Sequence, residues 1–312
     1  MLSAPQSVNC RPGRTGVPGA PGFGATGCGS EGFAVSNPAL LSAEITVRYP
    51  GKEPVLRGLS LEIQRGEVLG LIGQSGSGKS TLALAILGLL GRQRAAVEGK
   101  ITFQGADLLS MRERELRSLR GKTLSLVLQS PLASLNPALR IRTQLEEAWR
   151  AHRDTSATKA DCGTAIRSAL TSVSLPGSDD FLRKRPQQLS VGQAQRVLIA
   201  MAVMHRPALL LADEATSALD VITQAEILQL FSRLNRETGM SILYISHDLP
   251  SVAGICHRIA ILNEGQIVEC GPTDQIFAAP AHPYTQRLMS SLPQLPARPE
   301  DALARMQTAG GR

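Results

Sequence analysis

The chain has 312 residues, of which 43% are hydrophobic and only 3% aromatic, so it is long enough for one large or two small domains with a core of Leu, Ile, Val and Ala. Its net charge is +7, and its five cysteines are scattered without a C-x-x-C pair, which argues against a zinc site and a disulfide framework and fits a reducing cytosol. No apolar run reaches the ~18 residues that would span a bilayer, which excludes a membrane-spanning helix.

The N-terminal segment differs in composition from the rest of the chain. Residues 1–37 are rich in Gly, Pro, Ser and Ala without helical or strand periodicity, so we predict a disordered tail. From residue 41 onward, apolar residues alternate around Ile45 and Val47 and recur between Val55 and Ile63, which predicts a small, mostly antiparallel sheet. Tyr49 lies in this region, and on chemistry alone an ordinary strand aromatic is favoured over a ring that stacks on a nucleotide base.

The stretch from 67 to 81 contains the spacing Gly73-x-x-x-x-Gly78-Lys79-Ser80, which is typical of a phosphate-binding P-loop. An apolar run at 68–72 predicts a buried strand before it, and a run at 82–90 predicts a helix after it. Glycines let successive backbone N–H groups face a phosphate at a helix N-terminus. Lys79 is predicted to reach the β- and γ-phosphates, and the Ser80 hydroxyl to ligate Mg²⁺. The predicted nucleotide-binding residues of this loop are Gly73, Gln74, Ser75, Gly76, Ser77, Gly78, Lys79, Ser80 and Thr81.

The segment after the P-loop helix is strongly charged, and a mostly helical region follows it. Residues 99–105 predict a short strand, and 108–119 an amphipathic helix. Its basic side chains suit nucleic acid or an anionic membrane surface, but a solvated helix face is favoured. These residues are Arg112, Arg114, Arg117, Arg120 and Lys122. A strand at 124–128 ends at Gln129, and residues from about 130 to 190 predict a helical insertion in an α/β domain.

Polar side chains follow two further apolar strands. The strand at 209–212 ends in Asp213 and Glu214, and the strand at 241–245 is followed by His247. Parallel α/β sheets place catalytic groups at this end of their strands. With a P-loop present, a metal ligand and a general base are therefore favoured over polar strand ends without a function.

Helices and a hairpin account for the remaining segments. Ser190 and Gln193 have the spacing of a capping box at the start of a helix that extends to about 205. Asp220 precedes a helix predicted at 221–234. A hairpin is predicted at 259–269, a helical segment at 273–292, and a mobile tail beyond Pro293.

Taken together, these motifs resemble an ATP-binding cassette (ABC) ATPase subunit. The P-loop, Gln129 as a Q-loop, Leu189-Ser-Val-Gly-Gln193 as a signature, Asp213-Glu214 as Walker B, 217–220 as a D-loop and His247 as a switch histidine occur in the order of that family. The resemblance covers residues 41–270. It implies an α/β P-loop NTPase core with an antiparallel β subdomain and a helical insertion.

The resemblance also implies roles for individual residues. ATP and Mg²⁺ are the expected cofactors, with Tyr49 stacking on the adenine and Ser80, Gln129 and Asp213 around the metal. Glu214 is the expected general base, and His247, Lys79 and Gln129 complete the catalytic set. Ser190, Gly192, Gln193 and Asp220 are expected to reach the nucleotide held by a second ABC ATPase subunit, identical or paralogous.

Finer features resemble the oligopeptide, dipeptide and nickel importer branch. The segments from Gln129 to Pro137 and from His282 to Met289 are similar to those of that branch. The resemblance implies that 271–312 is an importer-type C-terminal extension. The resemblance implies an importer for peptides or a related small solute, at the cytoplasmic face of the inner membrane. Two integral membrane permease subunits and, indirectly, a solute-binding protein are the expected partners. No cysteine lies beyond Cys270, so we expect no iron–sulfur cluster.

Two departures from the family pattern stand out. Val191 replaces the first glycine of the usual Leu-Ser-Gly-Gly-Gln signature, and Ala215 replaces the usual proline after the catalytic glutamate. A β-branched residue does not readily adopt positive φ, so Val191 weakens the signature if glycine's freedom is needed there. Nickel or metal-chelate import remains a close alternative. A non-transport ABC ATPase that acts on nucleic acid is less favoured, as is an exporter, and no nucleic-acid partner is expected.

Overall fold

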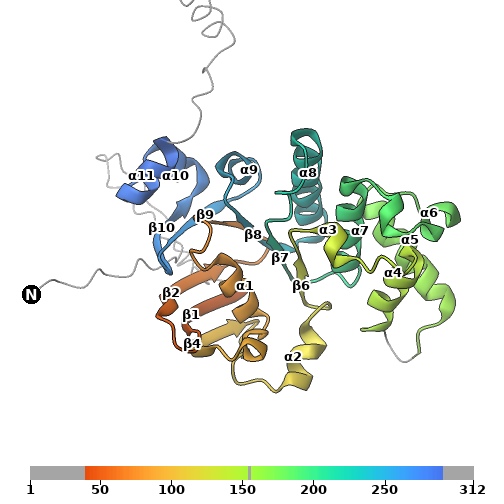
Figure 1. Ribbon diagram of the computed structural model, residues 1–312, viewed down its shortest axis with the longest axis horizontal. Helices are drawn as coiled ribbons and strands as arrows, with labels where there is room; N and C mark the ends of the chain where they lie inside the picture. The colour runs from red at the N-terminus through yellow and green to blue at the C-terminus, as the bar shows by residue number, and fades with distance from the viewer. Residues whose placement is uncertain (1–38, 154–155, 291–312) are drawn as a thin grey trace, which may run out of the picture.

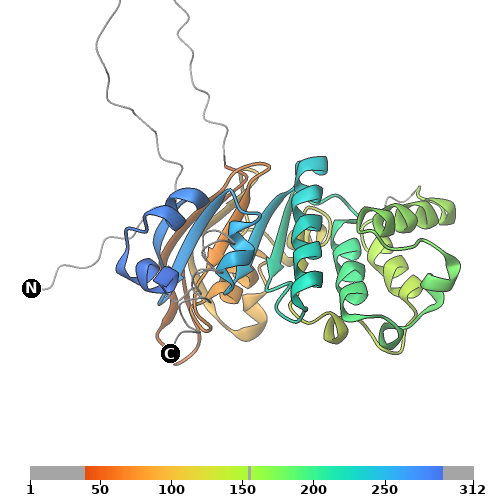
Figure 2. The ribbon, with the colours of Figure 1, turned by 90° about the horizontal axis from the view of Figure 1, so that it is seen from above.

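The structure is a computed structural model that describes residues 39–153 and 156–290. The predicted disordered tail at 1–37 and the predicted mobile end beyond Pro293 lie outside these residues. The described part is elongated, with two sheets in one half and a group of short helices in the other (Figures 1 and 2).

The first sheet is antiparallel, with the strand order β2-β1-β4-β5. Its strands are β1 (Leu41–Arg48), β2 (Pro54–Ile63), β4 (Ala96–Phe103) and β5 (Ala106–Asp107). Buried and more exposed residues alternate along β1, as in a strand with one face against the core. The predicted antiparallel sheet is therefore confirmed.

The second sheet has the order β10-β9-β3-β8-β7-β6. In chain order its strands are β3 (Val68–Ile72), β6 (Leu124–Val127), β7 (Leu209–Asp213), β8 (Ser241–Ser246), β9 (Arg258–Asn263) and β10 (Gln266–Pro272). All run parallel except β10, which pairs antiparallel with β9 as the predicted hairpin. Every residue of β3 and β8 is buried, as expected for parallel strands covered on both faces.

The parallel sheet is the middle layer of the core. Leu69 and Leu71 of β3 pack with the antiparallel sheet and with α1 (Lys79–Ile86), which lies between the sheets. Val68 and Ile72 point to the other face, where they pack in one core with α8 (Val221–Thr238) and α9 (Leu249–Ala253). Alternation along each strand thus divides the apolar residues between two cores.

The predicted helical insertion is present between β6 and β7 (Figure 1). It consists of α3 (Pro131–Ser134), α4 (Ile141–Arg150), α5 (Lys159–Ser172), α6 (Asp179–Arg183) and the 3₁₀ turn η2 (Pro186–Gln188), followed by α7 (Val191–Val203). Ala194 and Val197 of α7 belong to the same core as Leu145 of α4 and Leu210 of β7. Helix α7 therefore joins the helical subdomain to the parallel sheet.

Several predicted boundaries are wrong, each for a local reason. The helix after the P-loop ends at Ile86, because Gly88 takes the left-handed conformation (φ 63°), and a 3₁₀ turn η1 (Leu90–Gln93) comes next. Helix α2 (Glu113–Leu119) begins later than the predicted residue 108, because Arg112, its N-cap, has extended backbone (φ −71°, ψ 155°). The predicted C-terminal helix is two helices, α10 (Thr273–Ala278) and α11 (Pro283–Ser290), separated by a segment that contains Pro280.

The cysteines only partly agree with the sequence expectation. Cys162 and Cys256 carry free, buried thiols. Cys270 is disulfide-bonded. The scattered cysteines argued against a disulfide framework, but spacing along the chain does not report which thiols meet in space. Among the helices of residues 39–153 and 156–290, none is both long and apolar enough to cross a membrane.

Candidate active site

The loop between β3 and α1 has a backbone that requires glycine at several positions. Gly76 (φ 82°) and Gly78 (φ 110°) both have positive φ, which is costly for residues with a Cβ. Gly73 lies so close to β9 that an added Cβ would be 2.3 Å from the backbone oxygen of Leu262. The resulting turn exposes Gln74, Ser75 and Gly76, as a loop that wraps an anion would.

Lys79, the first residue of α1, spans this loop. Its side chain is buried, and Nζ donates to the carbonyl oxygens of Gly73 (2.7 Å) and Gln74 (3.0 Å). Burial lowers the pKa of Lys79, while the nearby charges of Glu214 and Asp213 oppose that shift. The ammonium group is therefore held by the loop carbonyls, where the charges of both carboxylates act on it.

Asp213, at the end of β7, faces the start of α1. Burial raises the pKa of Asp213 and the charge of Glu214 adds to this, while a hydrogen bond with the Ser80 side chain and the charge of Lys79 lower it. Asp213 Oδ1 is buried and has no hydrogen-bond partner among the described residues. A carboxylate oxygen without a partner next to a hydroxyl is a donor set that fits Mg²⁺.

Glu214 and His247 meet at the carboxyl edge of adjacent strands β7 and β8. His247 Nδ1 lies 3.3 Å from Glu214 Oε1, and the histidine side chain is the more exposed of the two. Glu214 has a positive φ of 47°, an uncommon conformation for a non-glycine residue. Its N–H donates to Ile245 O (2.9 Å), and its carbonyl accepts from Ser217 Oγ (3.0 Å), so both sides of the strained residue are fixed.

A chain of buried hydroxyls lies below this pair, and sequence reasoning missed it. Thr216 Oγ1 and Tyr244 OH are 2.9 Å apart, Tyr244 OH donates to Ser251 Oγ (3.3 Å), and Ser251 Oγ lies 3.3 Å from Ser246 Oγ. Ser246 Oγ in turn accepts from the N–H of Asp248 (2.9 Å). The chain connects the loop after Glu214 to the loop that carries His247. Its only sequence signal was a tyrosine inside an otherwise aliphatic strand.

Gln129 and Tyr49 lie at the ends of other strands. Gln129 is exposed two residues after β6, the strand next to β7, so it shares the carboxyl edge with Asp213. Tyr49 directly follows β1 and is partly buried against the core that contains α1. The P-loop, His247, Glu214 and Gln129 thus lie just beyond the four adjacent parallel strands β3, β8, β7 and β6.

The signature residues form a separate group at the N-termini of α7 and α8. Ser190 caps α7, accepting from the N–H of Gln193 at 3.2 Å while Gln193 Oε1 accepts from Ser190 N–H, so the predicted capping box is confirmed. Gly192 packs so tightly that an added Cβ would lie 2.6 Å from Thr223 Cγ2 of α8. Asp220 caps α8, and its contacts with Thr223 lower its pKa.

Val191 is the first residue of α7, does not have positive φ, and is 39% exposed as a residue. The backbone at this position is therefore one that valine readily adopts. Among the described residues, no hydrogen bond or ion pair joins the signature segment 190–193 to the P-loop.

Comparison with known proteins identifies this arrangement. A sequence model of the ABC transporter family matches residues 56–217, which is more than half of the chain. The chain belongs to the ABC transporter family. A second model, the C-terminal region of oligopeptide/dipeptide transporters, matches residues 268–310.

Several characterised relatives of this ABC protein align over most of its length. It is 40% identical to the dipeptide transport ATP-binding protein DppD of Bacillus subtilis, over 79% of this chain and 73% of that protein. It is 39% identical to the oligopeptide transport ATP-binding protein OppD of Escherichia coli, over 81% and 74% of the two chains. It is 41% identical to the glutathione import ATP-binding protein GsiA of Salmonella typhimurium, but covers 43% of that longer chain.

Solved structures of the family have the same fold. The ATP-binding cassette MJ0796, in a dimeric post-hydrolysis state bound to ADP and Pi, matches with a TM-score of 0.64 and 28% identity over 75% of this chain and 98% of that chain. CbiO1 of Clostridium perfringens matches with a TM-score of 0.68 at 24% identity over 86% and 99% of the two chains, a likeness of fold. The predicted family, its importer-type C-terminal region and the P-loop fold with two subdomains are therefore confirmed, and this ABC protein is an ATPase.

Proposed function

We propose that the chain is the ATP-hydrolysing subunit of an importer for peptides or a related small solute. The observation that carries the hydrolytic part is the cluster at the edge of the parallel sheet, where Lys79, Asp213 and Glu214 converge on the P-loop. Hydrolysis of a phosphoanhydride needs positioned phosphates, a neutralised charge and an oriented water. The chain offers a group for each task.

The phosphates of ATP would be held by the backbone N–H groups of the P-loop and by Lys79. In the structure, the Lys79 ammonium group donates to two loop carbonyl oxygens. Phosphate oxygens would replace these carbonyls as acceptors, because hydrogen bonds between two charged groups are stronger. Tyr49, at the end of β1, is proposed to stack on the adenine. Mg²⁺ would be held by Ser80, Gln129 and Asp213, and it would neutralise charge on the phosphate oxygens.

Glu214 is proposed as the general base for the attacking water. Its side chain is 21% exposed, so it reaches the solvent side of the cluster while its backbone is fixed. His247, whose Nδ1 lies 3.3 Å from Glu214 Oε1, is proposed to contact the γ-phosphate and to report whether it is present. The chain of hydroxyls through Tyr244 fixes the loop after Glu214 relative to the loop that carries His247.

The site is proposed to be completed by a second ATPase subunit. Ser190, Gly192, Gln193 and Asp220 lie at two neighbouring helix N-termini, and their capping bonds stay within those two helix ends. In a head-to-tail pair, these N–H groups and the Ser190 hydroxyl would face the nucleotide of the partner. That MJ0796 forms a dimer supports this proposal.

The import function is proposed from the relatives and from the helical subdomain. DppD and OppD are named as dipeptide and oligopeptide transport ATP-binding proteins, and the matched C-terminal region belongs to the same branch. Two permease subunits would dock on the helical subdomain at the cytoplasmic face of the inner membrane, with a solute-binding protein acting indirectly. Nickel or a metal chelate remains the second candidate solute, because the sequence resemblance extends to nickel importers.

Two experiments test these proposals separately. Glu214→Gln should retain ATP binding and lose hydrolysis by at least about 100-fold, the usual contribution of a general base. Glu237→Gln, a change of the same type on the exposed end of α8, should hydrolyse ATP normally. Unchanged turnover in Glu214→Gln would refute the base assignment. For import, the assembled complex with its permeases should show dipeptide-stimulated ATPase activity, and stimulation by Ni²⁺ alone would favour the second candidate.

A further inference from the structure

A basic groove lies between the core and the helical subdomain, away from the candidate active site. It has a volume of about 540 Å³ and is bounded by α2 with the turn after it on one side and by the end of α4 on the other. The described residues that line it include no acidic side chain. They are Arg114, Arg117, Ser118, Arg120, Lys122, Ala151, His152 and Arg153.

Most of the positive charges in the basic groove are uncompensated. Arg114, Arg117, Lys122 and Arg153 are exposed, and none has an ion pair or side-chain hydrogen bond with another described residue. Arg120 differs, because it pairs with Glu113 at 2.7 Å and donates to Leu87 O. Helix α2 also carries Glu113 and Glu115, but these carboxylates pair with Arg120 and Arg112. The remaining cations, gathered in a concave surface, are therefore available to attract an anion.

His152 lines the basic groove together with these cations. Its ring packs edge-on against His205 at 5.5 Å, and its Nε2 would be 2.9 Å from a Cβ on Gly121. Burial lowers the pKa of His152, the charges of His205 and Lys122 lower it further, and a hydrogen bond with the Arg120 backbone opposes this. Of the groove cations, Lys122 acts on the His152 ring by its charge, and an anion bound in the groove would act on the ring with the opposite sign.

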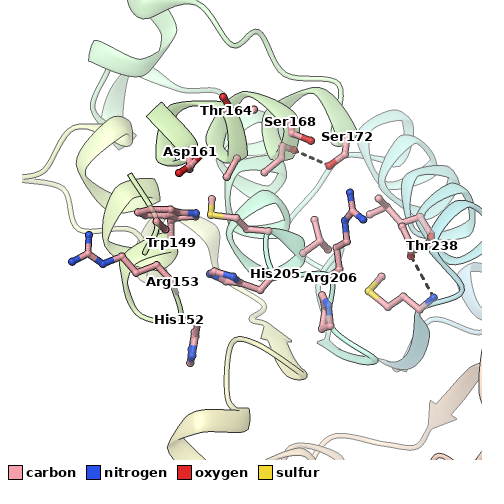
Figure 3. Close-up of a pocket in the computed structure, with 18 of the residues that line it drawn as sticks. Trp149, His152, Arg153, Asp161, Thr164, Ser168, Ser172, His205, Arg206 and Thr238 are labelled. Carbon is pink, nitrogen blue, oxygen red and sulfur yellow. Dashed lines mark hydrogen bonds between the residues drawn. The ribbon is translucent and has the colours of Figure 1, made fainter. Parts of the chain in front are cut away.

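The neighbouring cavity has a different character. It has a volume of about 990 Å³ and lies between α4, α5, α7 and the end of α8. Figure 3 shows His152 and Arg153 on one side of this cavity and Asp161 with the hydroxyl side chains of α5 on the other. Its walls carry both signs of charge, and Asp161 is already bonded to Thr158. The basic groove, and not this cavity, is therefore the surface whose charge favours an anion.

We propose that the basic groove binds a small anion that carries phosphate groups. Guanidinium forks match the paired oxygens of phosphate, and three of the uncompensated cations are arginines. The volume is in the range of small-ligand sites, which favours a compact polyanion or a single lipid headgroup over a flat surface. A bound anion would link α2 of the core to the end of α4, and so restrain the helical subdomain against the sheet.

The test uses the full chain and reads the imidazole signals of His152 by NMR, assigned with His152→Gln. Saturating ADP occupies the P-loop. The probes are pyrophosphate, vesicles that contain phosphatidylglycerol, and citrate as a carboxylate of similar charge. The groove variant is Arg114→Gln/Arg117→Gln/Lys122→Gln. The matched control is Arg65→Gln/Lys159→Gln/Arg236→Gln, which removes the same charge at exposed positions without side-chain partners among the described residues.

We expect a phosphate probe to shift His152 toward the protonated form and raise its pKa. Each basic residue near an anionic surface contributes about fivefold in affinity, so the groove variant should bind vesicles about 100-fold more weakly than the control. A response to pyrophosphate supports a soluble ligand, and a response to vesicles alone supports a lipid headgroup. Equal binding of citrate, no response to either phosphate probe, or a full response in the groove variant would overturn the proposal. Because the three side chains are exposed, the groove variant should keep the melting temperature of the control; if it does not, Arg153→Gln replaces it.

Discussion

Substituting Gly192 by alanine tests the contact between the signature helix and the helix that begins after Asp220. An added Cβ would lie 2.6 Å from Thr223 Cγ2, far inside van der Waals contact. The threonine cannot simply rotate away, because its Oγ1 donates to Asp220 Oδ2 at 2.8 Å and β-branched side chains have few rotamers. Either α7 and α8 must move apart, or the Asp220 cap must be lost.

Two effects of opposite sign determine the size of the change. Overpacking of this kind costs about 1–3 kcal/mol. Replacing glycine by alanine inside a helix returns up to about 1 kcal/mol. The cost of the clash is the larger of the two, so the free energy of unfolding should fall by about 1–2 kcal/mol. For a domain of this size, this loss corresponds to a fall of about 2–8 °C in melting temperature.

The measurement is thermal unfolding of four proteins: wild type, Gly192→Ala, Thr223→Ser and the double variant. Serine keeps the hydroxyl that bonds Asp220 and removes the clashing methyl, so the double variant should recover most of the lost stability. Gly163→Ala is the control, since its nearest contact is the flexible end of Arg167 at 3.4 Å and the change should be neutral or stabilising. A Gly192→Ala protein that unfolds at the wild-type temperature, or a double variant that shows no recovery, would refute this reasoning.

Three further predictions concern single side chains. Val191→Gly should leave the ATPase rate of the assembled complex nearly unchanged, because valine already has helical backbone at the start of α7; a large increase would show that the valine handicaps the site. Tyr244→Phe should cost about 1–3 kcal/mol in chemical unfolding, because the buried hydroxyls of Thr216 and Ser251 lose a partner, whereas an unchanged midpoint would contradict a structural role for the chain of hydroxyls. Because the pKa of His152 is lowered in the folded protein, the unfolded state binds more protons and stability falls as pH drops through the normal histidine range. His152→Gln should reduce that fall between about pH 7.5 and 5.5, and an identical fall in both proteins would contradict it.

The placement of the proposed site residues was predictable because each belongs to a short local pattern. The glycine spacing before Lys79 is fixed by backbone curvature that needs positive φ, and this constraint acts within a few residues. Apolar runs that end at Asp213 and His247 predict buried parallel strands, and all such strands present their carboxyl ends at one edge. Sequence and elementary stereochemistry were therefore sufficient to bring these residues together.

The sequence determined by itself the fold class, the P-loop, the two carboxylates and the capping box of Ser190, since each depends on periodicity or on residues within one turn of each other. Only the tertiary structure decided that Gly192 packs against Thr223, that Tyr244 links two loops, and that the end of α4 completes a basic groove with α2. These contacts join segments tens of residues apart, and no local propensity records which side chains will meet after the sheets and helices pack. The sequence predicted that the arginines around α2 form a solvated helix face. The packing of α2 beside the end of α4 instead makes them one wall of the basic groove, where most of the positive charges have no acidic partner.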